Sequence, residues 1–172
     1  MRIRYAAAAC AGAAVLGSLT GCTVPGAGAM GITVTSDGQP VGVLMVCHDH
    51  LDGATLYTDT DTGDDTEDVA TWSHPKSLTG FTAWPLATGG GGWTIDRPMP
   101  ATLERQRTYT LYGWTEDNSW SANEVTFTLA QLAALTPGRV RYYHAGDGSD
   151  SDRDGYRTAS VGDFRADACR NS

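Results

Sequence analysis

Basic residues are scarce in this chain of 172 residues. Twelve lysines and arginines stand against 20 aspartates and glutamates, which gives a net charge of −8, and Lys76 is the one lysine. A surface of this sign repels phosphate groups. The composition therefore argues against nucleic-acid binding and against electrostatic docking on anionic lipid.

Several catalytic sequence motifs are missing as well. The chain has no Gly-x-Ser-x-Gly nucleophile elbow, no phosphate-binding loop and no His-Glu-x-x-His zinc motif. Its pairs of acidic residues fall mainly in loop-like segments, where nothing apolar would raise a carboxyl pKa. The sequence therefore favours a noncatalytic protein.

Long hydrophobic runs are limited to the start of the chain. Arg2 and Arg4 precede an apolar run from Tyr5 to Leu19. The run is shorter than the stretch of about 20 residues that crosses a bilayer comfortably. A basic start, a short apolar run and small residues at its end are typical of a secretory signal peptide.

The sequence Leu-Thr-Gly-Cys at 19–22 resembles the lipobox of bacterial lipoproteins. The resemblance implies removal of residues 1–21, a diacylglyceryl group on the Cys22 thiol, and a lipid-anchored protein on the extracytoplasmic face of the cell membrane. Two acyl chains anchor a protein stably, whereas one does so only marginally. The layout also resembles the short lipoproteins of filamentous actinobacteria, which implies no particular activity. An ordinary secretory signal and an uncleaved membrane helix are the alternatives.

Cysteine is also sparse. With Cys10 in the signal peptide and Cys22 assigned to lipid, Cys47 and Cys169 remain of the four. Two such cysteines outside the cell favour a disulfide, which would fix the C-terminal tail to an early strand. A reactive thiol at Cys47 is the alternative, although the sequence offers no identifiable base to activate it.

Three segments follow the signal peptide. We expect a lipidated tether over 22–30, a single β domain over 31–143 and an acidic, largely irregular tail over 144–172. Short β runs separated by turn residues fill the domain. The run from Val41 to Cys47 is apolar on both faces, as a central strand is.

The β domain is predicted to be all-β, an antiparallel β-sandwich of seven or eight strands with one short helix over 130–135. Residues 109–114 and 124–129 alternate and should form a hairpin. Tyr109, six residues after Leu103, resembles the tyrosine corner of immunoglobulin-like and fibronectin type III domains. The resemblance implies that Tyr109 packs inward and that its hydroxyl bonds to backbone near the preceding corner.

Two histidines follow the central strand. If the strand continues, His48 and His50 point to one side, at a spacing by which two imidazoles can share a zinc ion. Asp52, Asp49 or His74 could supply a third ligand. A polar loop between strands is the alternative.

Acidic residues suggest a second metal. Asp150, Asp152 and Asp154 match the first half of an EF-hand calcium loop, but Val161 stands where that loop has a bidentate acid. The acids between 59 and 65 form a weaker version of the pattern. A solvated acidic tail without a cofactor is favoured over calcium binding.

Five tryptophans in one small domain raise the hypothesis of carbohydrate binding, because sugar faces stack on flat rings. With Tyr109 inward, alternation puts Tyr112 and Trp114 on the opposite face, and the following turn carries Asn118 and Trp120. An uncovered aromatic face of this kind would be a binding patch. Ordinary packing of the rings within the sheet is the alternative.

Together these features predict a membrane-anchored extracytoplasmic lipoprotein that binds a cell-wall glycan or another envelope protein without catalysis. Its partners would be that ligand and, through Cys22, the lipid bilayer. Two other functions stay open. One is a metal-binding protein or metal-dependent enzyme that uses His48 and His50, and the other is a structural envelope protein.

Overall fold

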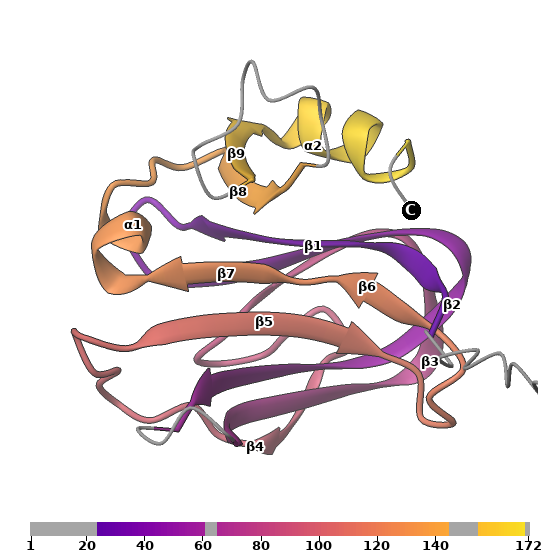
Figure 1. Ribbon diagram of the computed structural model, residues 1–172, viewed down its shortest axis with the longest axis horizontal. Coiled ribbons are helices and arrows are strands. Elements are labelled where there is room, and N and C mark those ends of the chain that lie inside the picture. Colours follow the sequence, from indigo (N-terminus) through magenta and orange to yellow (C-terminus); the bar gives the residue numbers. More distant parts are fainter. Residues whose placement is uncertain (1–23, 61–64, 145–154, 171–172) are drawn as a thin grey trace, which may run out of the picture.

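Two strands of 20 residues each, β2 (Pro40–Asp59) and β3 (Thr66–Pro85), run through the whole fold of the computed structural model (Figure 1). The structure describes residues 24–60, 65–144 and 155–170. β2 and β3 pair antiparallel along their length. The sequence predicts several short strands over this stretch, whereas the structure has one long hairpin.

Bulges bend this hairpin, the larger two of them near its middle. The register shifts between Val46 and Leu51 and again between Leu51 and Gly53, so extra residues loop out of β2 and then out of β3. Bulges bend and twist a strand. The first half of β2 therefore pairs with β1 (Gly26–Val34), and the second half pairs with β5 (Thr108–Trp114).

The remaining elements complete one nine-stranded sheet within the described residues. They are β4 (Thr94–Arg97), β6 (Ser121–Asn123), β7 (Val125–Thr128), α1 (Leu129–Ala133), β8 (Arg139–Tyr143), β9 (Tyr156–Ser160) and α2 (Val161–Ala168). The sheet runs β4-β3-β2-β5-β6-β1-β8-β9, β7 pairs with β5, and the β1–β2 pairing closes a ring of four strands. The all-β prediction is confirmed. The expectation of purely antiparallel pairing is wrong, since β1 and β6 are parallel.

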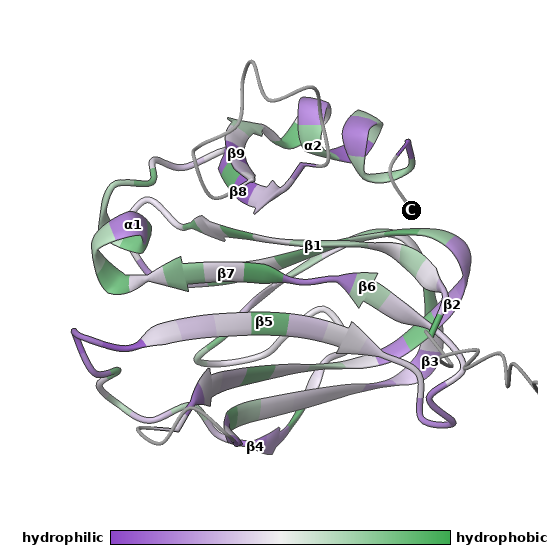
Figure 2. Cartoon of the chain, in the orientation of Figure 1, coloured by the Kyte–Doolittle hydropathy of each residue, from purple (hydrophilic) through white to green (hydrophobic). Residues whose placement is uncertain are grey.

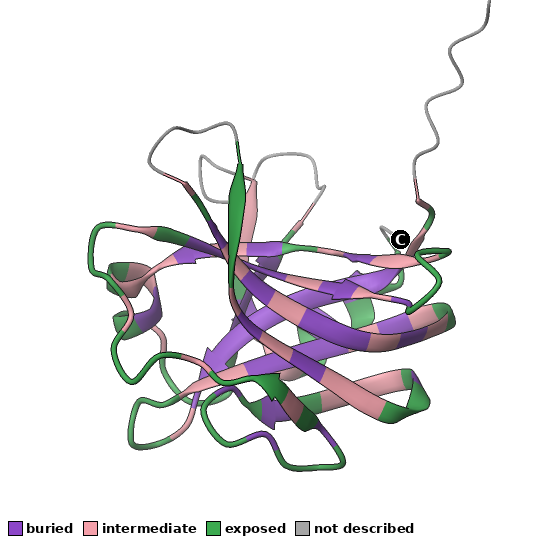
Figure 3. Ribbon diagram, turned by 90° about the horizontal axis from the view of Figure 1, so that it is seen from below, coloured by how far each residue is buried: buried purple, intermediate pink, exposed green. Residues whose placement is uncertain are grey.

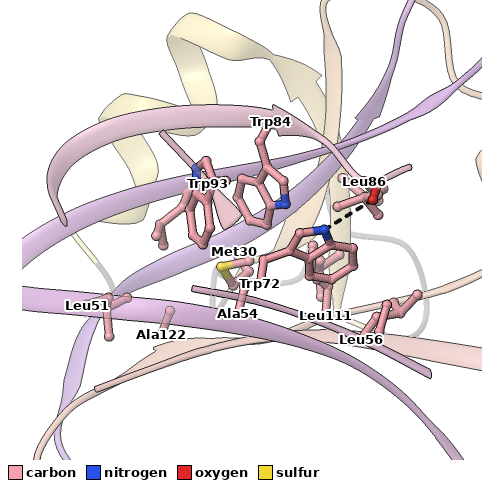
Figure 4. Packing of buried hydrophobic residues seen from close by; sticks show 14 of the residues in the cluster. Met30, Leu51, Ala54, Leu56, Trp72, Trp84, Leu86, Trp93, Leu111 and Ala122 are labelled. Carbon is pink, nitrogen blue, oxygen red and sulfur yellow. Dashed lines mark hydrogen bonds between the residues drawn. The ribbon is translucent and has the colours of Figure 1, made fainter. Parts of the chain in front are cut away.

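Tryptophan side chains fill the centre of the main core (Figure 4). Trp72 and Trp84 are fully buried, and Trp93 is 5% exposed. Trp84 stacks on Trp93 with ring centroids 4.0 Å apart, and Trp72 meets Trp84 edge-on at 6.1 Å. Trp120 is half-buried and packs against the same cluster. Packing within the domain thus accounts for four of the five tryptophans.

The first part of β2 packs against apolar side chains on both faces, as predicted for the run from Val41 to Cys47. Leu44 and Val46 belong to the main core, whereas Val43 belongs to a second apolar cluster, with Val41 and Met45 packed against it. The second cluster includes the buried apolar side chains of β9 and α2, which lie beyond β1 in Figure 1. This part of the sheet is therefore covered on its outer side.

The C-terminal tail is more ordered than the sequence predicts. Its described part forms β9 and α2 rather than irregular chain. The predicted disulfide between Cys47 and Cys169 is confirmed, with Cα atoms 5.3 Å apart, and it fixes the end of α2. Asp167, 4% exposed, accepts hydrogen bonds from the Tyr142 hydroxyl at 2.6 Å and from Arg157 at 2.9 Å. Contacts with residues distant in sequence therefore order this segment.

Strand β1 begins inside the segment that the sequence assigns to a tether. Residues 26–30 belong to β1, and Ala27 and Met30 are fully buried. A Cβ at Gly28 would overlap the carbonyl oxygen of Met45 on β2. The small residues serve close backbone packing, so the tether prediction for 22–30 is wrong from residue 26 onward.

Tyr109, near the start of β5, bonds to the backbone of the segment that precedes the strand. Tyr109 is 2% exposed, and its hydroxyl accepts the Glu104 N–H at 2.7 Å and lies 3.4 Å from the Glu104 carbonyl oxygen. Helix α1 confirms the predicted short helix, and Thr128 and Gln131 form a capping box at its start. Neither helix in the described chain is long and apolar enough to cross a membrane.

Candidate ligand-binding site

The bulged region of the β2–β3 hairpin borders an open pocket of about 610 Å³. The pocket lies where the hairpin meets the turn between β5 and β6, and Figure 2 shows hydrophilic colour at this bend of β2 and in that turn. Its lining combines one indole ring with polar and ionisable side chains. The lining residues are His50, Asp52, Ser73, His74, Pro75, Ser77, Thr94, Trp114 and Glu116.

Trp114 lies flat on the sheet beside this pocket. Three atoms of its six-membered ring would lie within 2.8 Å of a Cβ at Gly53, the residue opposite it on β2. An edge-on ring would bring only two atoms so close, so the face of the ring covers Gly53. The indole Nε1–H donates to Thr55 Oγ1 at 2.9 Å and fixes the orientation of the ring. One ring face is thus packed on backbone, while Trp114 still lines the pocket.

The outward direction of Trp114 follows from the alternation along β5. Tyr109 and Leu111 are buried, and Gly113 faces Met30 in the core. Tyr112 and Trp114 are half-buried. Figure 3, which views the fold from below, shows buried and intermediate colours alternating along the strands. The two rings therefore share the outer face of this layer.

Asp52 joins the hairpin to the turn between β5 and β6. Its Oδ2 accepts the backbone N–H of Glu116 at 3.0 Å, and its Oδ1 accepts the Ser77 hydroxyl at 3.3 Å. The Nε2 atom of His50 lies 3.5 Å from Oδ2. One carboxylate thus links three of the chain segments that line the pocket, namely β2, β3 and the turn after β5.

His50 has a carboxylate at each ring nitrogen. Its Nδ1 bonds to Asp49, which adopts a positive φ of 50° in the bulge, and its Nε2 faces Asp52. The hydrogen bond to Asp49 raises the pKa of His50 above its ordinary value of 6.5, and the charges of Asp52 and Asp117 act in the same direction. The site therefore favours the imidazolium form of His50.

His74 lines the pocket from β3. Its ring meets Trp93 edge-on, with centroids 5.7 Å apart, and its Nδ1 lies 2.6 Å from the carbonyl oxygen of Lys76. The Lys76 backbone N–H also points at this nitrogen, with its N atom 3.3 Å away, so Nδ1 faces the Lys76 backbone and Nε2 lies on the opposite edge of the ring. A Cβ at Gly92 would come within 2.5 Å of that Nε2. Glycine at position 92 therefore makes room for the imidazole.

Three of the four residues of the predicted aromatic patch lie outside the pocket lining, and Tyr112 is one of them. Trp120 packs against the main core, and Asn118 is exposed in the turn with a φ of 57°. Neither lines the pocket, which Trp114 shares with Glu116 and His74 instead. These partners come from a turn and a bulge, and no local sequence pattern brings a turn and a bulge together.

The predicted ligands His48, His50 and Asp52, which the structure describes, do not form a metal site. His48 is exposed, and both ring nitrogens of His50 face carboxylates. Within 24–60, 65–144 and 155–170, no group of three or more His, Cys, Asp or Glu side chains is arranged to hold a metal ion. Asp150, Asp152 and Asp154 lie outside the described residues.

Neither of two candidate nucleophiles is set up for catalysis. Ser73 and Lys76 have the Ser-x-x-Lys spacing of some acyl-enzyme nucleophiles. The Ser73 hydroxyl donates to Asp96 Oδ1 at 3.1 Å, so its proton is directed to a carboxylate rather than to an amine. Cys47 is in the disulfide, which removes the alternative of a reactive thiol.

A second pocket of about 420 Å³ lies beside the start of β5, at the other end of that strand from Trp114. Its two arginines are already engaged. Arg107 Nε lies 3.0 Å from Glu104 Oε2, and the Arg97 guanidinium donates to the Asp68 carbonyl oxygen. The Trp114 pocket is the better candidate, because it offers an aromatic face together with polar groups.

Comparison of the chain with models of known protein families, with curated proteins and with solved structures gave no match.

Proposed function

We propose that this chain is a noncatalytic glycan-binding module of the cell envelope, held by lipid on Cys22 at the extracytoplasmic face of the membrane. The observation that carries the proposal is the Trp114 platform, a ring packed on Gly53 that borders a pocket. The flat face of a sugar ring stacks on such a surface, and sugar hydroxyls bond to polar groups around it. The rim supplies hydroxyl, imidazole and carboxylate groups, which are both donors and acceptors.

A short link between the lipid and the fold supports a position next to the membrane. The Pro25 carbonyl oxygen accepts the Ser121 N–H at 3.1 Å, and Ser121 pairs with Trp114 across β5 and β6. Cys22 stands three residues before Pro25, a reach of at most about 11 Å. A lipid on Cys22 would therefore hold the Trp114 end of the domain beside the bilayer.

The anchor is tested by Cys22→Ser. We expect the variant to appear in the culture medium, while the unmodified chain stays in the membrane fraction. Equal release of both chains would contradict the anchor and leave the glycan site untouched.

We also propose that the domain is related to immunoglobulin-like and fibronectin type III domains. The hydrogen bond from the Glu104 N–H to the Tyr109 hydroxyl and the antiparallel β5–β7 pairing support it. The ring formed by β1, β2, β5 and β6 departs from a sandwich of two separate sheets. The resemblance therefore rests on this corner and not on the strand order.

Glycan binding is tested with the full-length chain in a polyoxyethylene detergent, because sugar-based detergents would compete. Isothermal titration with solubilised cell-wall glycan fragments should give saturable binding, weakened at least about tenfold by Trp114→Ala. The matched control is Tyr143→Ala, which removes a 42% exposed ring from β8. Gly53→Ala should also weaken binding, because its Cβ displaces the ring. Unchanged affinity after Trp114→Ala would overturn the proposal.

A further inference from the structure

We propose that the glycan bound at the Trp114 pocket carries a free amino group, so that the ligand is an amino sugar in its cationic form. This inference rests on the proposed function and narrows it to one class of sugar. It is carried by the charge around the platform, which is negative, and by the chemistry of the indole face.

Carboxylates surround the pocket. Asp52 and Glu116 line it, and Asp49 and Asp117 lie close enough to act on His50 together with Asp52. His50 lies between Asp49 and Asp52, and Lys76 stands between the lining residues Pro75 and Ser77. Even with His50 protonated and Lys76 counted, four carboxylates against two cations leave the site net negative. Acidic sugars would be repelled there, and a protonated amine would be attracted.

The indole face favours the same ligand. An ammonium group within about 6 Å of a tryptophan ring is attracted to the negative π face. The packing of Trp114 on Gly53 and its bond to Thr55 hold the ring in place, so binding need not order it. An amino sugar presents both an apolar ring face for stacking and a cation for the surrounding carboxylates.

Glu116 is the carboxylate best placed to form an ion pair with the amino group of the ligand. Asp52 already accepts hydrogen bonds from the Glu116 N–H and the Ser77 hydroxyl and lies next to His50. Glu116 is exposed at the rim, and its backbone N–H anchors it to Asp52. Glu116→Gln would remove the charge and keep this backbone bond.

The test compares two probes on the full-length chain in a polyoxyethylene detergent at about pH 6, below the ordinary pKa of an amine. One probe is the β-1,4-linked glucosamine tetramer, and the other is the N-acetylglucosamine tetramer, which has the same rings without the charge. We expect the amine to bind at least about tenfold more tightly, with an affinity that falls as salt rises. Glu116→Gln should abolish most of this preference, and Glu67→Gln, an exposed carboxylate at the other pocket, should not.

The outcomes separate this inference from the proposed function. Equal binding of both tetramers, with no effect of Glu116→Gln but a loss on Trp114→Ala, would overturn the amino-sugar inference and leave the platform as a glycan site. Absence of binding for both tetramers and for wall fragments would overturn the proposed function, and this inference with it.

Discussion

At Gly28 the backbones of β1 and β2 approach too closely for a side chain. Gly28→Ala would push its Cβ into the Met45 carbonyl oxygen, and backbone cannot move aside cheaply. We expect a loss of about 3 kcal/mol or more in the free energy of unfolding, measured by urea denaturation. Gly38→Ala is the control, since its Cβ would meet nothing within 4 Å and only its φ of 80° opposes it, at about 1 kcal/mol. Similar losses for both variants would contradict the close packing of β1.

The pKa of His50 depends on the carboxylates around the pocket and can be measured to test their effect. Its pKa is raised by Asp49, so protonation of His50 favours the folded state. This contribution is fully present below about pH 6.5 and is lost as the pH rises through the folded pKa. In Asp49→Asn the His50 pKa should fall back toward 6.5, which NMR titration of the imidazole Cε1–H would measure. An unchanged pKa would mean that the Asp49 hydrogen bond is absent in solution.

Helix α2 has eight residues and depends on tertiary contacts. Its disulfide spans 122 residues, so replacing Cys47 and Cys169 by alanine should lower the free energy of unfolding by at most about 4 to 5 kcal/mol in the chain-entropy model. We expect the amides of α2 to lose hydrogen-exchange protection first, while those of β2 keep theirs. Equal loss in both elements would show that α2 and the sheet unfold as one unit.

The elements that the sequence predicts well are those whose pattern is local. Alternation identified both faces of 41–47, and the turn after Trp114 indicated the β5–β7 hairpin. The elements it missed depend on distant partners. The small residues within 26–30 predict a flexible segment. In the structure their size has another reason, because the Met45 backbone lies against Gly28 and leaves no room for a side chain. Order in α2 depends on Cys47 and on the contacts of Asp167, which no window of the sequence reveals.

In the candidate site, too, the sequence predicts the local features and misses those that depend on distant residues. Alternation along β5 places Trp114 on the outer face, but the platform depends on Gly53, which only the register of β2 and β5 puts beneath it. His50, Asp52 and His74, grouped in sequence as candidate zinc ligands, do line one pocket. The bulges turn two of them toward carboxylate and hydroxyl partners, and the sequence carries no local sign of these bulges.

At the scale of the whole molecule, the position of β1 decides where the folded unit begins. A chain that starts at Gly31 lacks the buried Ala27 and Met30 and the pairing of β1 with β6. We expect it to lose more than about 3 kcal/mol in the free energy of unfolding relative to a chain that starts at Val24, measured by urea denaturation followed by circular dichroism. Equal stability would mean that residues 24–30 form a tether after all.

The central claim is that the face of Trp114 away from Gly53 binds a glycan. Its most direct test follows the indole Nε1–H signals by NMR as cell-wall glycan fragments are added, with the Trp114 signal assigned from Trp114→Phe. The Trp114 signal should move progressively and saturate, while the signal of Trp72, buried and bonded to the Leu86 carbonyl oxygen, stays in place. A Trp114 signal that does not move, or that moves no more than that of Trp72, would contradict the claim.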